Sequence, residues 1–183
     1  MSDVHDSRYE PTNLPYRVAV LCYLWSGCGD DDDHLLMLHR AKEPNTDMYS
    51  PIGGKVEVSL GESPHQCAIR EIKEEAGLEL ALEDVRLLGV VAEKAYENEM
   101  HWLLFLFEAT SPVDPDRVER LEFEEGVLEW VKVSDVENRN IPRTDREVLW
   151  RFVRKHRQGG FFMIDIDCSG EDLAWRMVQE QSG

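Results

Sequence analysis

The segment Ser63–Ala76 constrains the fold of this chain most, because both ends of a helix can be recognised from its residues. Ser63 suits the N-cap, Pro64 suits the first helical position, and Gln66 stands where a capping box requires it. Gly77 follows at the position where a left-handed C-terminal cap belongs. We therefore predict a helix over this segment, against which other elements must pack.

The predicted helix has an apolar side and an acidic side. At about 100° per residue, small and aliphatic side chains share one face; they are Ala68, Ile69, Ile72 and Ala76. Glu71, Glu74 and Glu75 gather on the other face, because positions i, i+3 and i+4 are neighbours on a helix. Carboxylates this close repel one another unless something compensates. The face is therefore either a solvated acidic surface, common in such a charged chain, or a site for hard cations such as Mg²⁺.

The residues around this face favour the second interpretation. The stretch Glu62-x7-Arg70-Glu71-Ile72-x-Glu74-Glu75-x-Gly77-Leu78 resembles the signature of the Nudix hydrolases at every specified position. The resemblance implies that Glu71, Glu74 and Glu75 bind metal ions. It also implies that Arg70 pairs with Glu62 and braces the loop against the helix, for which a bidentate arginine–carboxylate contact is well suited. The implied cofactor is Mg²⁺, with Mn²⁺ as the alternative.

The loop before Glu62 departs from the family pattern. The family's first glycine position falls on Val56 here, and Gly54 is the nearest preceding glycine, so the loop is two residues longer. In the family this glycine often offers its carbonyl oxygen to a metal. The resemblance therefore assigns that role to Gly54.

Runs of β-branched and aromatic residues predict strands on both sides of the helix. They cover residues 16–25, 34–40, 85–93, 101–109, 127–133 and 161–166. The second is expected to pair back on the first, with a solvated hairpin loop at 26–33, and residues 50–54 are expected to form a turn. Further helices are expected at 144–156 and 171–179. We predict an α/β (α+β) fold, and the resemblance implies a Nudix-type α/β/α sandwich with a mixed β-sheet flanked by helices.

The length of 183 residues fits a single domain at 16–183, after a flexible lead-in at 1–15. The net charge of −17, from 37 acidic against 20 basic residues, disfavours nucleic-acid polymers and anionic membranes as partners. It also means that a phosphate-cleaving site would need cations to invert the local field. The four cysteines show no zinc spacing, and we expect reduced thiols and a cytoplasmic location.

Outside the signature, several side chains are candidates for further roles. Family members often use an additional glutamate as metal ligand or general base, and Glu125 and Glu99 are our candidates, with Glu74 as the alternative within the signature. Most such acids are simply solvated. Aromatic faces can stack a nucleobase, although core packing is their commoner role; the candidates are Tyr96, His101, Trp102 and Trp130. Arg40 and Lys42 could meet substrate phosphates.

The sequence therefore predicts an enzyme that hydrolyses a diphosphate linkage in a small nucleotide-type substrate with Mg²⁺. A catalytically silent nucleotide-binding sensor on the same fold is the alternative, although all signature acids are present. An isomerase acting on allylic diphosphates and an RNA-cap hydrolase are weaker alternatives. The particular substrate stays open, and a homodimer is compatible with the sequence.

Overall fold

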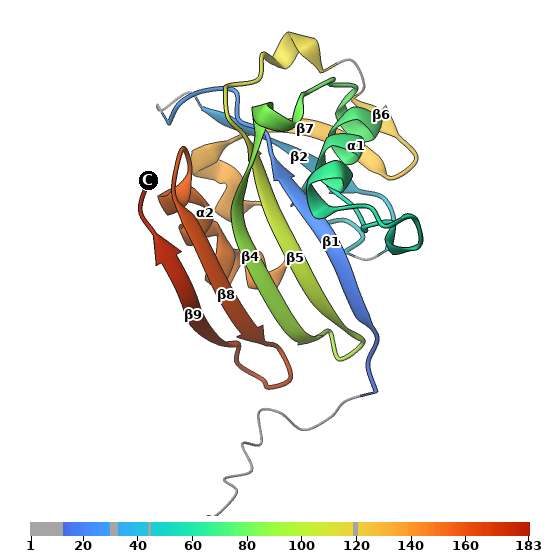
Figure 1. Cartoon of the computed structure of the whole chain (residues 1–183), viewed down its shortest axis with the longest axis vertical. Helices are drawn as coiled ribbons and strands as arrows, with labels where there is room; N and C mark the ends of the chain where they lie inside the picture. The colour runs from blue at the N-terminus through green and yellow to red at the C-terminus, as the bar shows by residue number, and fades with distance from the viewer. Residues whose placement is uncertain (1–12, 30–32, 44, 119–120) are drawn as a thin grey trace, which may run out of the picture.

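The computed structural model describes residues 13–29, 33–43, 45–118 and 121–183, and its strands form two sheets (Figure 1). The larger, mixed sheet has the order β1-β5-β4-β8-β9. Its strands are β1 (Tyr16–Tyr23), β4 (Val85–Tyr96), β5 (Met100–Ala109), β8 (Phe161–Asp167) and β9 (Ala174–Gln181). β1 runs parallel to β5 and β4 runs parallel to β8, whereas the β4–β5 and β8–β9 pairs are antiparallel.

The smaller sheet is antiparallel and has the order β3-β2-β7-β6. Its strands are β2 (His34–Arg40), β3 (Tyr49–Pro51), β6 (Glu122–Phe123) and β7 (Gly126–Lys132). The expectation that β2 pairs back on β1 was wrong for most of its length, because β3 and β7 occupy both edges of β2. The two segments meet only beyond the end of β1, where the Leu36 N–H donates to the carbonyl of Leu24 at 3.0 Å.

Two helices flank the sheets, as predicted. In Figure 1, α1 (Pro64–Ala76) lies in front of β1, and α2 (Trp150–His156) lies behind the larger sheet. A π-helical turn at Asp145–Leu149 leads directly into α2. The capping box of α1 is confirmed: the Gln66 N–H donates to the Ser63 hydroxyl at 3.2 Å, and the Ser63 N–H donates to the Gln66 side chain at 3.0 Å.

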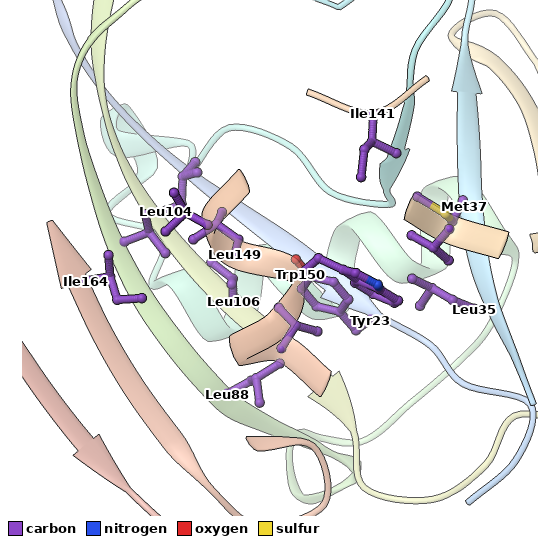
Figure 2. Close-up of a cluster of buried hydrophobic side chains, with 14 of the residues drawn as sticks. Tyr23, Leu35, Met37, Leu88, Leu104, Leu106, Ile141, Leu149, Trp150 and Ile164 are labelled. Atoms are coloured by element: carbon purple, nitrogen blue, oxygen red, sulfur yellow. The ribbon is translucent and has the colours of Figure 1, made fainter. Parts of the chain in front are cut away.

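The core is divided between these two helices because alternate residues of a buried strand point to opposite faces. Val20 and Cys22 of β1 join the cluster packed against α1, while Ala19 and Tyr23 join the cluster packed against α2. Figure 2 shows the second cluster, in which Trp150 of α2 lies beside Tyr23. The α/β/α arrangement predicted from the sequence is therefore confirmed.

The helix expected at 171–179 was wrong, because residues 174–181 form β9. Without β9, one edge of β8 would be unpaired, and β9 satisfies the backbone groups of that edge by antiparallel pairing. The Trp175 ring also packs edge-on against Phe152 of α2, with ring centroids 5.6 Å apart. Pairing and packing outweigh the local helix preference of this segment.

The loop at 26–33 differs from the expected solvated hairpin at Asp33, whose side chain is buried. Its carboxylate accepts the N–H groups of Gly27 at 2.9 Å and Gly29 at 3.0 Å, and it pairs with Arg157. The other aspartates of the loop, Asp30–Asp32, lie outside the described residues, as does most of the lead-in at 1–15.

The four cysteines are free thiols. In the described part of the chain, no helix combines the length and apolar character that crossing a bilayer would need.

Candidate active site

The segment that follows β3 positions one wall of the site. It was expected as a turn at 50–54, but it runs extended and antiparallel beside β1. The Val20 N–H donates to the carbonyl of Gly54 at 2.9 Å, and the Val56 N–H donates to that of Val18 at 3.0 Å. Gly53 has φ +150°, and a Cβ there would lie 2.1 Å from the carbonyl oxygen of Val20. Only glycine allows this close approach to β1.

Glu75 of α1 points into this wall rather than into solvent. One of its carboxylate oxygens accepts the Gly53 N–H at 2.9 Å, and the residue is only 4% exposed. Glu75 is therefore not part of a solvated acidic surface, which was the other interpretation of this helix face. Burial raises the pKa of Glu75 to about 8; the Gly53 N–H and Arg40 oppose this shift, while Glu71 and Glu125 add to it.

Glu71 lies beside Gly54 on the same wall. A Cβ on Gly54 would stand 2.1 Å from the Oε1 atom of Glu71, so this glycine leaves the space that the carboxylate occupies. Burial raises the pKa of Glu71; Arg70 lowers it, while Glu74 and Glu125 raise it further. Together Gly53, Gly54, Glu71 and Glu75 form what we call the α1 wall.

The predicted pair between Arg70 and Glu62 is present as a bidentate contact. Arg70 donates from Nε and one terminal nitrogen to the two oxygens of Glu62 at 2.8 and 3.0 Å. The guanidinium also contacts Glu71 at 2.6 Å, Glu74 at 3.1 Å and the Lys55 carbonyl at 3.2 Å. The hydrogen bonds from Arg70 lower the pKa of Glu62 to about 2. Arg70 therefore ties the loop before α1 to the acidic side of that helix.

The α1 wall suits a divalent cation by its donor chemistry. Glu71, Glu75 and the Gly54 carbonyl offer the oxygen ligands that hard cations prefer, and a bound cation would offset the repulsion between the carboxylates. Within the described ranges, no three His, Cys, Asp or Glu side chains already converge as metal ligands do. Arg70 contacts one oxygen of Glu71 and one of Glu74, which leaves the second oxygen of each carboxylate outside these two hydrogen bonds.

A cavity of about 600 Å³ opens at the α1 wall. Glu125, Arg40 and Lys42 line it, as do Gly53, Gly54 and Glu71. The Ala41 N–H donates to the carbonyl of Glu125 at 2.7 Å and fixes the β6–β7 turn beside the end of β2. Lys42 pairs with Glu124. Glu99, the other candidate base, lies at the β4–β5 turn and is not among the residues that line this cavity.

A second wall of the cavity carries acids that the sequence analysis did not single out. We call it the β4 wall and define it by Glu93, Tyr96 and Trp102 of the larger sheet with Thr144 and Asp145 before α2. The signal for Glu93 was present in the sequence. Because strand residues alternate between faces, a glutamate in phase with Val91 points inward.

The structure places two of the four aromatic candidates at the cavity. Tyr96 and Trp102 line the cavity, and the Tyr96 hydroxyl donates to the Asn45 side chain at 2.8 Å. His101 accepts the Ala95 N–H at 3.0 Å, and Trp130 packs against the core on the α1 side; neither lines the cavity.

Comparisons with known proteins agree with this architecture. The model of the NUDIX domain family matches residues 15–152. The chain is 31% identical over 121 residues to the uncharacterized Nudix hydrolase YvcI of Bacillus subtilis, covering 64% of this chain and 70% of YvcI.

Two solved structures show the same fold. A MutT protein from Bacillus halodurans superposes with a TM-score of 0.63 at 23% identity, covering 88% of this chain and 97% of that one. The NUDIX domain of Shewanella oneidensis NrtR, solved with ADP ribose, superposes with a TM-score of 0.61 at 15% identity, covering 84% of this chain and 97% of that domain.

Proposed function

This chain belongs to the Nudix hydrolase family, whose members hydrolyse nucleoside diphosphate derivatives, and on this premise we propose that it cleaves a diphosphate linkage in a small nucleotide-type substrate with the help of Mg²⁺. The observation that supports the proposal most is the α1 wall. Glu71 and Glu75 are held largely away from water with raised pKa values, beside a cavity large enough for a nucleotide. Carboxyl groups in such surroundings favour a bound cation.

Glu71, Glu74, Glu75 and the Gly54 carbonyl are the groups that would hold the ions. When bound, Mg²⁺ polarises a phosphoryl oxygen, lowers the pKa of a coordinated water and neutralises charge on the leaving group. The Gly54 oxygen already accepts the Val20 N–H, but a carbonyl oxygen has a second lone pair. Mn²⁺ prefers similar oxygen ligands and is the alternative ion.

The chain's own side chains contribute positioning, phosphate binding and proton transfer in this proposal. Arg70 and Glu62 hold the loop and α1 in register, and Arg40 and Lys42 at the cavity bind phosphate oxygens. Glu125 is the favoured general base, because it lines the cavity and acts electrostatically on Glu71 and Glu75. Glu74 is the alternative base, and Glu99 is a weaker one because it is not at the cavity.

The net charge of −17 supports a small substrate rather than a nucleic-acid polymer, since the acidic surface repels a chain of phosphates. A single diphosphate can approach a site where cations reverse the local field.

The proposal is tested by incubating the protein with a broad panel of nucleoside triphosphates, nucleotide sugars and dinucleotides. Each substrate is tested with Mg²⁺, with Mn²⁺ and with EDTA, and mass spectrometry of the products locates the cut. We expect cleavage with Mg²⁺ and none with EDTA. Glu71→Gln and Glu75→Gln should lower kcat/KM by roughly 100-fold or more, because each removes a carboxylate that would hold the ion stabilising the transition state.

Glu79→Gln is the matched control, because Glu79 is an exposed acid just beyond the same helix and pairs only with Lys73 among the described contacts. It should keep full activity. If the unmodified protein cleaves nothing in the panel, or if the Glu75→Gln protein is as active as the unmodified one, the hydrolase proposal is wrong.

A nucleotide-binding sensor without catalysis is the second candidate. It is favoured by one observation, namely that Arg70 rather than an open metal site holds Glu71 and Glu74. A sensor would bind nucleotides equally well with and without Mg²⁺ in calorimetry and would leave them intact.

A further inference from the structure

The β4 wall contains a carboxyl group that the proposed hydrolysis does not use. Glu93 is 3% exposed, and its Oε1 atom is buried without a hydrogen-bond partner in the described part of the chain. Its side chain shares the inward face of β4 with Val91 and Ala95, which belong to the hydrophobic core. Buried polar groups are normally satisfied, so an unpartnered one beside a cavity points to a missing ligand.

The neighbours of Glu93 do not supply the missing donor. Burial raises the pKa of Glu93 to about 8, Asp145 raises it further, and only a hydrogen bond with Thr144 opposes the shift. Burial likewise raises the pKa of Asp145 to about 7. Two acids therefore face the same cavity, and no basic side chain contributes to the pKa of Glu93.

The β4 wall is poorly suited to phosphate, because it offers no cation and its carboxyl groups repel phosphate once they ionise. A ligand group suited to this wall must bring N–H donors. It must also be largely apolar, since Tyr96 and Trp102 line the cavity next to Glu93 and aromatic faces favour stacking. The α1 wall and Arg40 belong to the same cavity and suit phosphates. One ligand with a phosphate part and a flat, donor-bearing heterocycle matches both walls.

We propose that Glu93 is a specificity-determining residue that accepts a hydrogen bond from the exocyclic amino group of a substrate's nucleobase, with Asp145 as the second acceptor. This inference rests on the proposed function, since it names the base class of the substrate whose diphosphate is cut. The enzyme then selects amino-bearing bases, because an analogue without the amino group leaves the buried carboxyl unpaired.

The experiment compares nucleotides that differ by one amino group. Equilibrium binding is measured by calorimetry for guanosine and inosine 5′-monophosphates, and for the 5′-monophosphates of adenosine and purine riboside. We expect the unmodified protein to bind the amino-bearing member of at least one pair roughly tenfold tighter or more. Near-equal binding within both pairs, or no binding of any of the four, would overturn the inference.

Variants separate recognition from folding. Glu93→Leu removes the acceptor and should bring the binding ratio close to one by weakening only the amino-bearing nucleotide. Glu93→Gln is nearly isosteric and keeps an amide oxygen that can accept a hydrogen bond, so it should give an intermediate binding ratio. If Glu93→Leu does not fold, Glu93→Gln provides the test. Glu83→Gln changes an exposed acid outside the cavity and should keep the original ratio. A folded Glu93 variant with an unchanged ratio would sink the inference.

Monophosphate binding needs no hydrolysis, so the two proposals can fail separately. Cleavage of diphosphates without amino-group discrimination would remove the role of Glu93 and leave the hydrolase proposal intact. Discrimination in binding without any cleavage would support the role of Glu93 in base binding and remove the hydrolase proposal.

Discussion

Burial opposes ionisation of the Glu93 carboxyl group, and the stability of the fold therefore depends on pH. Its pKa rises from 4.5 in the unfolded chain to about 8 in the folded protein. The folded state therefore binds the proton more tightly. The contribution of the Glu93 carboxyl group to stability is fully present below about pH 4.5 and is lost as the pH rises through 8. Asp145 acts in the same direction, with a folded pKa of about 7.

We therefore predict that Glu93→Gln stabilises the protein at pH 9 but much less at pH 5. The rise from 4.5 to about 8 sets an upper bound of about 5 kcal/mol, since one pKa unit is about 1.4 kcal/mol. Urea denaturation at the two pH values measures the effect, with Glu83→Gln as the control that should show no pH-dependent difference. The same stabilisation at both pH values would contradict it. Together with weakened nucleotide recognition, such a gain would be a trade of stability for function.

The Glu62–Arg70 contact has the opposite pH dependence. The pKa of Glu62 falls from 4.5 to about 2, so its contribution to stability is present above pH 4.5 and is lost as the pH falls through 2. Glu62→Gln should lower the free energy of unfolding at pH 7 by about 1–3 kcal/mol, because it weakens a charge-assisted bidentate contact. The difference from the unmodified protein should narrow towards pH 2.5. Thermal unfolding monitored by circular dichroism at both pH values checks this, and a constant difference would argue against the assigned ion pair.

At the scale of elements, the glycines beside β1 have separate tasks. Gly53 adopts φ +150° against the backbone of Val20, whereas the space beside Gly54 is filled by the flexible end of Glu71. Backbone cannot yield to an added methyl group, but a side chain can turn away. The first glycine therefore supports the fold, and the second supports the placement of a carboxylate.

The prediction is that Gly53→Ala lowers the free energy of unfolding by about 2 kcal/mol or more, from strain and close contact. Gly54→Ala should cost less stability but displace Glu71 and reduce activity by about tenfold or more. Denaturation curves and kcat/KM are measured for both variants. Equal losses of stability in the two variants would refute the separate tasks.

The elements also show which parts of the site were predictable. α1 could be predicted with its caps, because local residues determine both ends of a helix, and the Arg70–Glu62 contact was implied by the resemblance to the Nudix signature. β9 and the extended path of Gly53 could not, since each depends on the free edge of another strand. Glu75 shows the same limit: its spacing places it on the acidic side of α1, but the position of Gly53 decides that it is buried.

At the scale of the whole molecule, the chain passes from the larger sheet to the smaller one between β1 and β2. Arg157 at the end of α2 contacts this segment: it pairs with Asp33 just before β2, and its guanidinium lies 4.0 Å from the ring centroid of Trp25. Asp33 is 1% exposed and also holds two N–H groups of its loop. The contact thus joins the end of α2 to the segment between β1 and β2.

Removing Arg157 alone should therefore lower the free energy of unfolding more than removing both charges of the pair. Arg157→Ala leaves a buried carboxylate without its cation, which costs about 3–5 kcal/mol. Asp33→Asn in the same chain removes that charge while keeping an oxygen for one of the two loop N–H groups, so the double variant should recover part of the loss. A double-mutant cycle from urea denaturation measures the coupling between the two residues. Strictly additive effects would mean that the ion pair contributes little.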